Sequence, residues 1–136
     1  MNWSDTQVTV MGLGLNQGGV GVVRYLLSRG AMVHVTDLKS EQDLYPSIRA
    51  IQELERGDTV TWSLGGHQNQ DFIKTDVVIK NPAVPETNSF IQIAQSHGVT
   101  VLTEGEIFVQ EITEAQTQIS CIGVTGTRGK TTTTLL

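Results

Sequence analysis

The sequence predicts an α/β domain built on an open, mainly parallel β-sheet with helices on both faces. Short apolar runs rich in β-branched residues alternate with amphipathic stretches of helical period, which is the pattern of parallel strands joined by crossover helices. Gly is abundant at 14 residues, Pro is scarce at 3, and hydrophobic residues make up 38% of the chain. At 136 residues the chain is long enough to bury the core of one such domain.

Strands and helices are expected to alternate along the chain as follows. The expected strands are 7–11, 31–36, 59–63, 76–80 and 99–102, and the expected helices are 18–28, 44–56, 71–73, 89–97 and 104–112. Arg29 and Gly30 should end the first helix, because a cation and a glycine are typical of helix C-termini. A polar linker at 114–118 should separate a first domain, 1–113, from a further buried strand at the start of a second, 119–136.

Composition and charge exclude several classes of protein. The net charge of −5 argues against a nucleic-acid backbone as partner. Cys121 is the only cysteine, so we expect a buried thiol and no disulfide framework. The N-terminus lacks the features of a signal peptide, and no apolar run is long enough to span a membrane. We therefore expect a soluble, cytoplasmic protein.

A glycine-rich turn, Gly12-Leu13-Gly14-Leu15-Asn16-Gln17-Gly18-Gly19, directly follows the first expected strand and opens the first expected helix. Free N–H groups around Leu15 and Asn16 would form an anion site at the helix N-terminus, suited to a diphosphate. Asp37 ends the next strand, where a carboxylate can bind a ribose hydroxyl or a base N–H. The dinucleotide pattern G-x-G-x-x-G would need glycine in place of Gln17. The residues alone leave open a nicotinamide cofactor, another nucleotide, or merely a tight turn.

The segment after the linker reads as a phosphate-binding loop. The run 119–124 has the composition of a buried strand, and Thr125-Gly126-Thr127-Arg128-Gly129-Lys130-Thr131-Thr132 follows it. Its glycines would let backbone N–H groups converge on phosphates, Lys130 would supply a charge, and Thr131 could bind Mg²⁺. The residues expected to bind ATP are Gly126, Thr127, Arg128, Gly129, Lys130, Thr131 and Thr132. The common spacing would need glycine at Val124, so a disordered Thr/Gly-rich tail is the alternative.

These two loops in this order resemble the Mur ligase family, which joins amino acids to UDP-linked cell-wall precursors. The motifs most similar to its D-glutamate-adding members are Gly12-Leu13-Gly14-Leu15, Gly30-Ala31-Met32-Val33 leading to Asp37, Asn81-Pro82-Ala83-Val84-Pro85, Glu104-Gly105-Glu106-Ile107-Phe108 and T-G-T-x-G-K-T. The resemblance implies that a Rossmann-like first domain binds UDP and that a central ATPase domain begins at the phosphate loop.

The resemblance also implies roles for particular residues. The implied UDP-binding residues are Gly14, Leu15, Asn16, Asp37, Leu38, Lys39 and Ala83. Asp37 would face the uracil, and Lys39 would lie near the uracil and the diphosphate. Ala83 stands where the family usually has the glycine of S-P-G, whose amide approaches the diphosphate. Asp37 could instead cap the following segment, and Lys39 could be a solvated surface lysine.

The implied chemistry is the ATP-dependent joining of UDP-N-acetylmuramoyl-L-alanine and D-glutamate through an acyl phosphate, with Lys130 as the catalytic residue and Mg²⁺ on Thr131. The chain alone would be inactive, because it lacks most of the ATPase domain and any amino-acid-binding domain, and no cofactor is expected on it. The alternatives are a nicotinamide-binding domain of an oxidoreductase, a nucleotide-sensing module, and a Mur ligase that adds another amino acid. The histidines, His34, His67 and His97, are interpreted as structural, because none has metal-ligand company.

Overall fold

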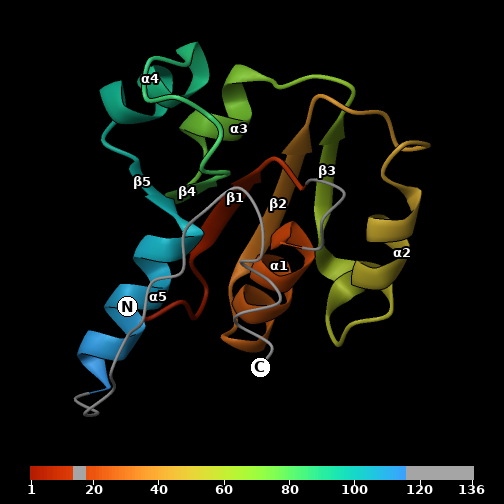
Figure 1. Ribbon diagram of the computed structural model, residues 1–136, viewed down its shortest axis with the longest axis horizontal. Coiled ribbons are helices and arrows are strands. Elements are labelled where there is room, and N and C mark those ends of the chain that lie inside the picture. The colour runs from red at the N-terminus through yellow and green to blue at the C-terminus, as the bar shows by residue number, and fades with distance from the viewer. Residues whose placement is uncertain (14–17, 116–136) are drawn as a thin grey trace, which may run out of the picture.

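A computed structural model describes residues 1–13 and 18–115 of the chain. Within them lies one five-stranded sheet, in which every neighbouring pair of strands is parallel (Figure 1). The strands are β1 Gln7–Met11, β2 Met32–Asp37, β3 Thr61–Leu64, β4 Val77–Lys80 and β5 Thr100–Thr103. Their order across the sheet is β3-β2-β1-β4-β5, which confirms the predicted open parallel sheet.

Helices cover both faces of this sheet, also as predicted. They are α1 Gly18–Ser28, α2 Tyr45–Gln52, α3 Asn69–Ile73, α4 Ser89–Ser96 and α5 Glu104–Glu114, with a 3₁₀ turn η1 at Gly57–Thr59. Apolar side chains of α1, α2 and α5 pack with Val8 and Val10 of β1 on one face. Those of α3 and α4 pack with Met11 and Val78 on the other. Successive strand residues point to opposite faces, so β1 contributes to both cores.

The segment between α2 and β3 differs from the sequence prediction. The helix expected over 44–56 ends at Gln52, and the strand expected from 59 begins at Thr61. Arg56 adopts a left-handed conformation with φ +62°, which cannot continue an α-helix, and the short turn η1 follows it. The amphipathic period continued past the point where the backbone turned, so the pattern overestimated the length of the helix.

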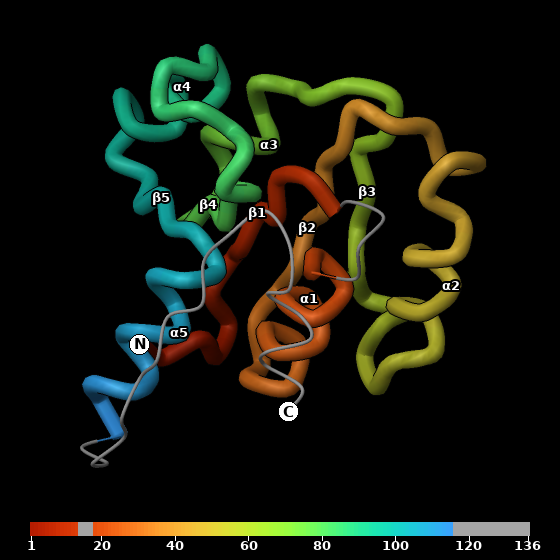
Figure 2. The backbone as a smooth tube through the Cα atoms, viewed as in Figure 1, coloured from red at the N-terminus to blue at the C-terminus, as the bar shows by residue number. Residues whose placement is uncertain are grey.

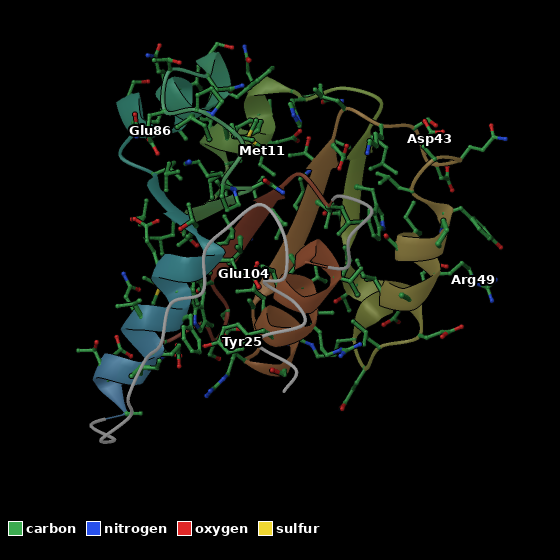
Figure 3. All side chains as sticks on the ribbon, viewed as in Figure 1. Met11, Tyr25, Asp43, Arg49, Glu86 and Glu104 are labelled. Carbon is green, nitrogen blue, oxygen red and sulfur yellow. The ribbon has the colours of Figure 1, made fainter. Side chains whose placement is uncertain are left out.

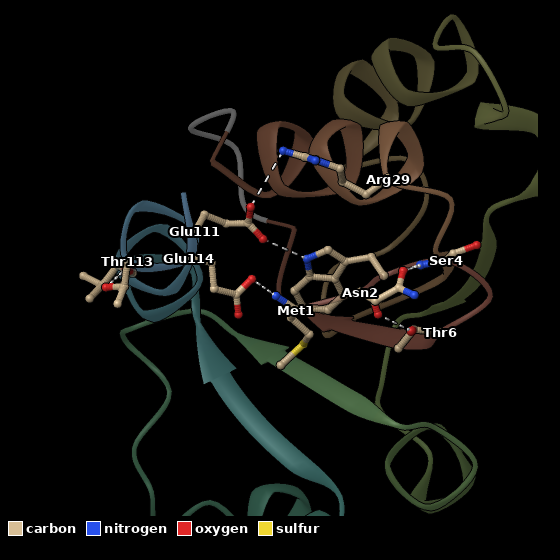
Figure 4. A network of polar contacts seen from close by, with 10 residues as sticks. Met1, Asn2, Ser4, Thr6, Arg29, Glu111, Thr113 and Glu114 are labelled. Atoms are coloured by element: carbon tan, nitrogen blue, oxygen red, sulfur yellow. Dashed lines mark hydrogen bonds and ion pairs between the residues drawn. The ribbon is translucent and has the colours of Figure 1, made fainter. Parts of the chain in front are cut away.

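The N-terminal segment fastens α5 to the rest of the domain (Figure 4). Trp3 is buried, and its indole N–H donates a hydrogen bond to Glu111 at 3.4 Å. Arg29, just beyond α1, pairs with the same carboxylate at 3.7 Å, and the amino group of Met1 pairs with Glu114. These contacts hold α5 on the same face of the sheet as α1.

The path of the chain creates a switch point beside β1 (Figure 2). From β1 the chain proceeds outward through α1, β2 and α2 to β3, and it then returns through α3 to place β4 on the other side of β1. The connections that leave the carboxyl ends of β1 and β4 therefore diverge. In sheets of this kind ligands bind in the crevice outside such a point.

Candidate functional site

Asp37 links the end of β2 to the glycine-rich turn. Its side chain is only 6% exposed, and its Oδ2 accepts the N–H of Leu13 at 2.8 Å. Its Oδ1 accepts the N–H of Lys39 at 2.8 Å. The carboxylate therefore caps the local backbone, as one of the two sequence interpretations had it. Its role in binding a ligand stays a prediction.

Leu38 and Lys39 project from the rim of the sheet just after Asp37. Leu38 is 70% exposed, and the side chain of Lys39 is exposed as well. The backbone of this corner is held more firmly than its side chains, because the carbonyl of Lys39 accepts the N–H of Gly65 at 2.8 Å. The corner thus presents an apolar and a cationic side chain from a fixed backbone.

On the other side of β1, the corner after β4 lies against the glycine-rich turn. A methyl group on Gly12 would come within 3.4 Å of the Cβ of Asn81. A pocket of about 50 Å³ opens here, lined on one side by Gly12 and the start of α1 and on the other by Asn81 and Pro82. The glycine-rich turn and the corner after β4 therefore meet at a small pocket beside β1.

The amide of Ala83, which the resemblance directs at a diphosphate, already has an acceptor. Its N–H donates to Oδ1 of Asn81 at 2.9 Å, while the carbonyl of Asn81 accepts the N–H of Val84 at 2.9 Å. This turn uses the asparagine side chain to satisfy the local backbone, as asparagine often does. An anion would have to displace the Asn81 side chain to reach that N–H.

Lys80, the last residue of β4, is a site feature that the sequence analysis missed. Its side chain is buried to 8% exposure, its Nζ donates to the carbonyl of Val84 at 2.9 Å, and it pairs with Glu86 at 3.1 Å. Glu86 is well exposed, so it neutralises the ammonium only in part. A lysine in an inward place of a buried parallel strand is the signal that could have identified it.

Glu104 places a negative charge close to the start of α1. A methyl group on Gly18 would lie 3.8 Å from Oε2 of Glu104, and Figure 3 shows this side chain between α5 and α1. The N-terminus of a helix carries partial positive charge and favours anions. The carboxylate of Glu104 therefore places a like charge where an anion at the start of α1 would lie.

His67 lies behind the Asp37 corner. Its Nδ1 is 2.7 Å from the hydroxyl of Thr36, and its ring packs edge-on against Phe72 and Phe90. Burial lowers the pKa of His67 below its usual value, and the nearby carboxylates of Asp37 and Asp71 only partly offset this effect. The imidazole is therefore neutral at neutral pH.

Some predicted site residues lie outside the described residues. They are Gly14, Leu15, Asn16, Gly126, Thr127, Arg128, Gly129, Lys130, Thr131 and Thr132. Cys121 lies outside them as well. Within 1–13 and 18–115, no group of three or more His, Cys, Asp or Glu side chains could hold a metal ion, and no helix could cross a membrane.

The strand order, the glycine-rich turn before α1 and the acidic residue that ends β2 define a Rossmann-like α/β fold. The family model described as "Mur ligase MurD-like, N-terminal domain" matches residues 6–103. The match covers most of the chain, which therefore belongs to this family.

Relatives with curated names agree with this assignment. The chain is 41% identical over 136 residues to the UDP-N-acetylmuramoylalanine--D-glutamate ligase of Roseiflexus sp. (strain RS-1), covering 100% of the chain and 27% of the relative. It is 40% identical over 123 residues to the enzyme of the same name from Borreliella burgdorferi (strain ZS7), covering 90% and 25%. The chain thus spans about a quarter of the length of these relatives.

Two solved structures share the fold. A pseudomurein peptide ligase type C from Methanothermus fervidus matches with a TM-score of 0.51 and 22% identity, over 93% of this chain and 24% of that one. Quinate dehydrogenase from Corynebacterium glutamicum, in complex with NAD, matches with a TM-score of 0.55 and 15% identity, over 82% and 49%. At these identities the likeness concerns the fold alone, so the bound NAD of the second structure does not choose a ligand for this chain.

Proposed function

We propose that the chain is the UDP-binding N-terminal part of a cytoplasmic ligase that adds D-glutamate to UDP-N-acetylmuramoyl-L-alanine during peptidoglycan synthesis. The observation that carries this proposal is the 41% identity to a D-glutamate ligase over the whole chain. The position of Asp37 supports it, because a buried carboxylate beside a glycine-rich turn suits a uridine nucleotide. In this proposal residues 1–113 form the UDP-binding domain, residues 114–118 form a linker, and residues 119–136 begin the central ATPase domain.

The uridine site would combine the described rim with the turn at Gly14, Leu15 and Asn16. Asp37 would accept a hydrogen bond from the uracil, and Leu38 and Lys39 would flank the nucleotide. Ala83 would contact the diphosphate through its exposed surface, because its N–H is used by Asn81. The anion would be bound chiefly by the N–H groups at the start of α1.

The phosphate loop would hold ATP in the full-length enzyme. Lys130 would neutralise charge on the transferring phosphoryl group, and the backbone N–H groups of 126–129 would cradle the phosphates. Thr131 offers a hard oxygen ligand of the kind that Mg²⁺ prefers, and the ion would neutralise phosphate charge. The substrate carboxylate would take the γ-phosphoryl group of ATP to form an acyl phosphate, and ADP would leave. The amine of D-glutamate would then attack the acyl carbon and lose a proton, so that phosphate leaves and an amide forms.

Calorimetric titration of the 136-residue chain tests the nucleotide class. UDP and UDP-N-acetylmuramoyl-L-alanine should bind more tightly than NAD, because the site would recognise uracil, which NAD lacks. Tighter binding of NAD would instead support the nicotinamide-binding domain of an oxidoreductase. Turnover assays of the full-length protein with different amino acids would distinguish D-glutamate addition from the addition of another amino acid.

The substitution Lys130→Ala tests whether the two nucleotide sites are separate. In the full-length enzyme it should abolish turnover, since phosphoryl transfer depends on charge neutralisation at this loop. UDP affinity of the 136-residue chain with the same substitution should stay unchanged by calorimetry. A parallel loss of UDP affinity would contradict the assignment of two separate sites.

A further inference from the structure

Three consecutive residues, Gly65, Gly66 and His67, form a strap between β3 and α3 that is bonded to the end of β2. The N–H of Gly65 donates to the carbonyl of Lys39 at 2.8 Å, and that of Gly66 donates to the carbonyl of Asp37 at 3.1 Å. The imidazole of His67 then bonds to the hydroxyl of Thr36 at 2.7 Å. Every one of these bonds ends on the segment that carries the Asp37 carboxylate.

The strap needs something to hold its conformation. Gly65 has φ +77° and Gly66 has φ +154°, values that glycine adopts readily and other residues rarely do. Glycine also leaves the backbone more freedom when no contact constrains it, so two glycines in succession make a flexible connection. The side chain that follows them therefore decides how firmly the strap is fixed.

The ring of His67 packs against side chains of two helices, α3 and α4. Its ring centroid lies 5.8 Å from that of Phe72 in α3 and 5.2 Å from that of Phe90 in α4, with interplanar angles of 88° and 75°. Edge-to-face contacts of this kind are favourable and restrict the orientation of the ring. The two phenylalanines thus keep Nδ1 of His67 directed at Thr36.

Thr36 connects His67 to the glycine-rich turn. Its side chain is fully buried, and its carbonyl accepts the N–H of Gly12 at 2.9 Å. The next residue, Asp37, accepts the N–H of Leu13. A continuous series of contacts therefore runs from the helices α3 and α4 through His67 and Thr36 to the turn at the nucleotide site.

We propose that His67 is a positioning residue for the uridine nucleotide, acting through Thr36 and the strap on the Asp37 corner and the glycine-rich turn. This inference rests on the proposed function. It acts by preorganisation: a corner that is already ordered does not lose conformational freedom when the nucleotide binds. His67 takes no part in the chemistry, so its contribution belongs to substrate binding and not to turnover.

Two substitutions separate the hydrogen bond from the packing. His67→Phe keeps an aromatic ring beside Phe72 and Phe90 but removes Nδ1, and Thr36→Val keeps the buried volume but removes the hydroxyl. Each should weaken UDP binding to the 136-residue chain about three- to tenfold in calorimetry, the usual worth of one hydrogen bond. His67→Asn places an amide where Nδ1 lies but lacks the ring that packs on Phe72 and Phe90, so its UDP affinity should lie between those of the wild type and His67→Phe.

The controls distinguish positioning from a merely structural role. His97→Asn, at the exposed end of α4, should leave UDP affinity unchanged. In the full-length ligase, His67→Phe should raise the KM for the UDP substrate and leave kcat unaltered, the mark of lost uniform binding. A lower melting temperature with unchanged affinity and KM in both His67→Phe and Thr36→Val would overturn the proposal.

Amide hydrogen exchange tests the strap without any ligand. The N–H groups of Gly65 and Gly66 should exchange faster in His67→Phe than in the wild type, because their bonds to the corner open more often. Equal exchange in the two proteins would overturn the proposal even if affinity fell. Failure of the wild-type chain to bind UDP would contradict the proposed function instead, and the exchange experiment would still decide whether His67 holds the strap.

Discussion

The two corners on either side of β1 are ordered by opposite means. After β2, the buried carboxylate of Asp37 gathers the backbone N–H groups of Leu13 and Lys39. After β4, the buried ammonium of Lys80 donates to the carbonyl of Val84 at 2.9 Å. The side chain of Asn81 accepts the N–H of Ala83. One corner is organised around an acceptor and the other around a cation.

This difference indicates which part of a nucleotide each corner can serve. The Asp37 carboxylate is a hydrogen-bond acceptor, which suits the N–H or hydroxyl groups of a uridine. In the second corner, the N–H of Ala83, which the resemblance assigned to the diphosphate, already donates to Asn81. The attraction of this corner for an anion therefore rests on the charge of Lys80. Glu104, across the small pocket from Asn81, opposes that attraction. The following substitutions test this division.

Asp37→Ala should have the largest effect. It removes a charged acceptor and also leaves the N–H groups of Leu13 and Lys39 without this partner, so UDP binding should weaken by about 1–3 kcal/mol, or about 5- to 150-fold. Calorimetry on the 136-residue chain measures this loss. Asp43→Ala removes an exposed acid on the connection to α2 and is the matched control. An unchanged KM for the UDP substrate in the full-length Asp37→Ala enzyme would contradict the role of Asp37.

Lys80→Met should weaken UDP binding by about 1 kcal/mol, because it removes a positive charge near the expected diphosphate. The melting temperature should change little, since an apolar side chain of similar shape replaces a buried ion. Glu86→Gln removes only the exposed partner and should not lower UDP affinity. Affinity that falls equally in both variants would show that the ion pair, and not the ammonium, serves the corner.

Glu104→Gln should strengthen UDP binding by about 0.5–1 kcal/mol, because it removes a like charge beside the start of α1. The gain should shrink as salt is added, since the pocket is open to solvent and its charges are screened. Titrations at two ionic strengths measure both effects. Glu55→Gln, an exposed acid on the segment after α2, controls for the change in net charge. A gain that is equal in both variants would point to net charge alone.

The smallest expected effect is a pH dependence of stability that arises from His67. Burial lowers its pKa in the folded state, so the unfolded chain binds the proton more readily. Stability from this group should be complete above about pH 6.5 and should fall as the pH drops from there to the folded-state pKa. Denaturant unfolding of the wild type and of His67→Phe across this range measures the difference. Equal slopes in the two proteins would exclude a contribution from His67.

Much of the fold follows from local sequence patterns. β1 and α1 occupy the residues that periodicity predicted, because their apolar spacing and their flanking glycines agree with the final packing. The turn η1 was missed because it depends on the left-handed conformation of Arg56, which no periodic pattern reveals. Local patterns therefore predicted the regular elements and not the short irregular connection.

Only those contacts of the candidate site that follow from the order of strands and turns along the chain could be predicted from the sequence. Asp37 ends a strand beside the glycine-rich turn, and parallel strands bring those two points to the same edge. The bond from Lys80 to Val84 depends on how the intervening turn folds back, and the approach of Glu104 to α1 depends on the packing of α5. Those relations arise from tertiary structure. The ATP-binding role of 126–132 stays a prediction.

The bond between Thr36 and His67 joins two residues whose side chains are otherwise ordinary for a strand and a turn. If one of the two side chains is replaced, the other loses its hydrogen-bond partner and is no longer constrained by this bond. Across distantly related ligases these two positions should therefore evolve as a pair, with a change at one accompanied by a compensating change at the other.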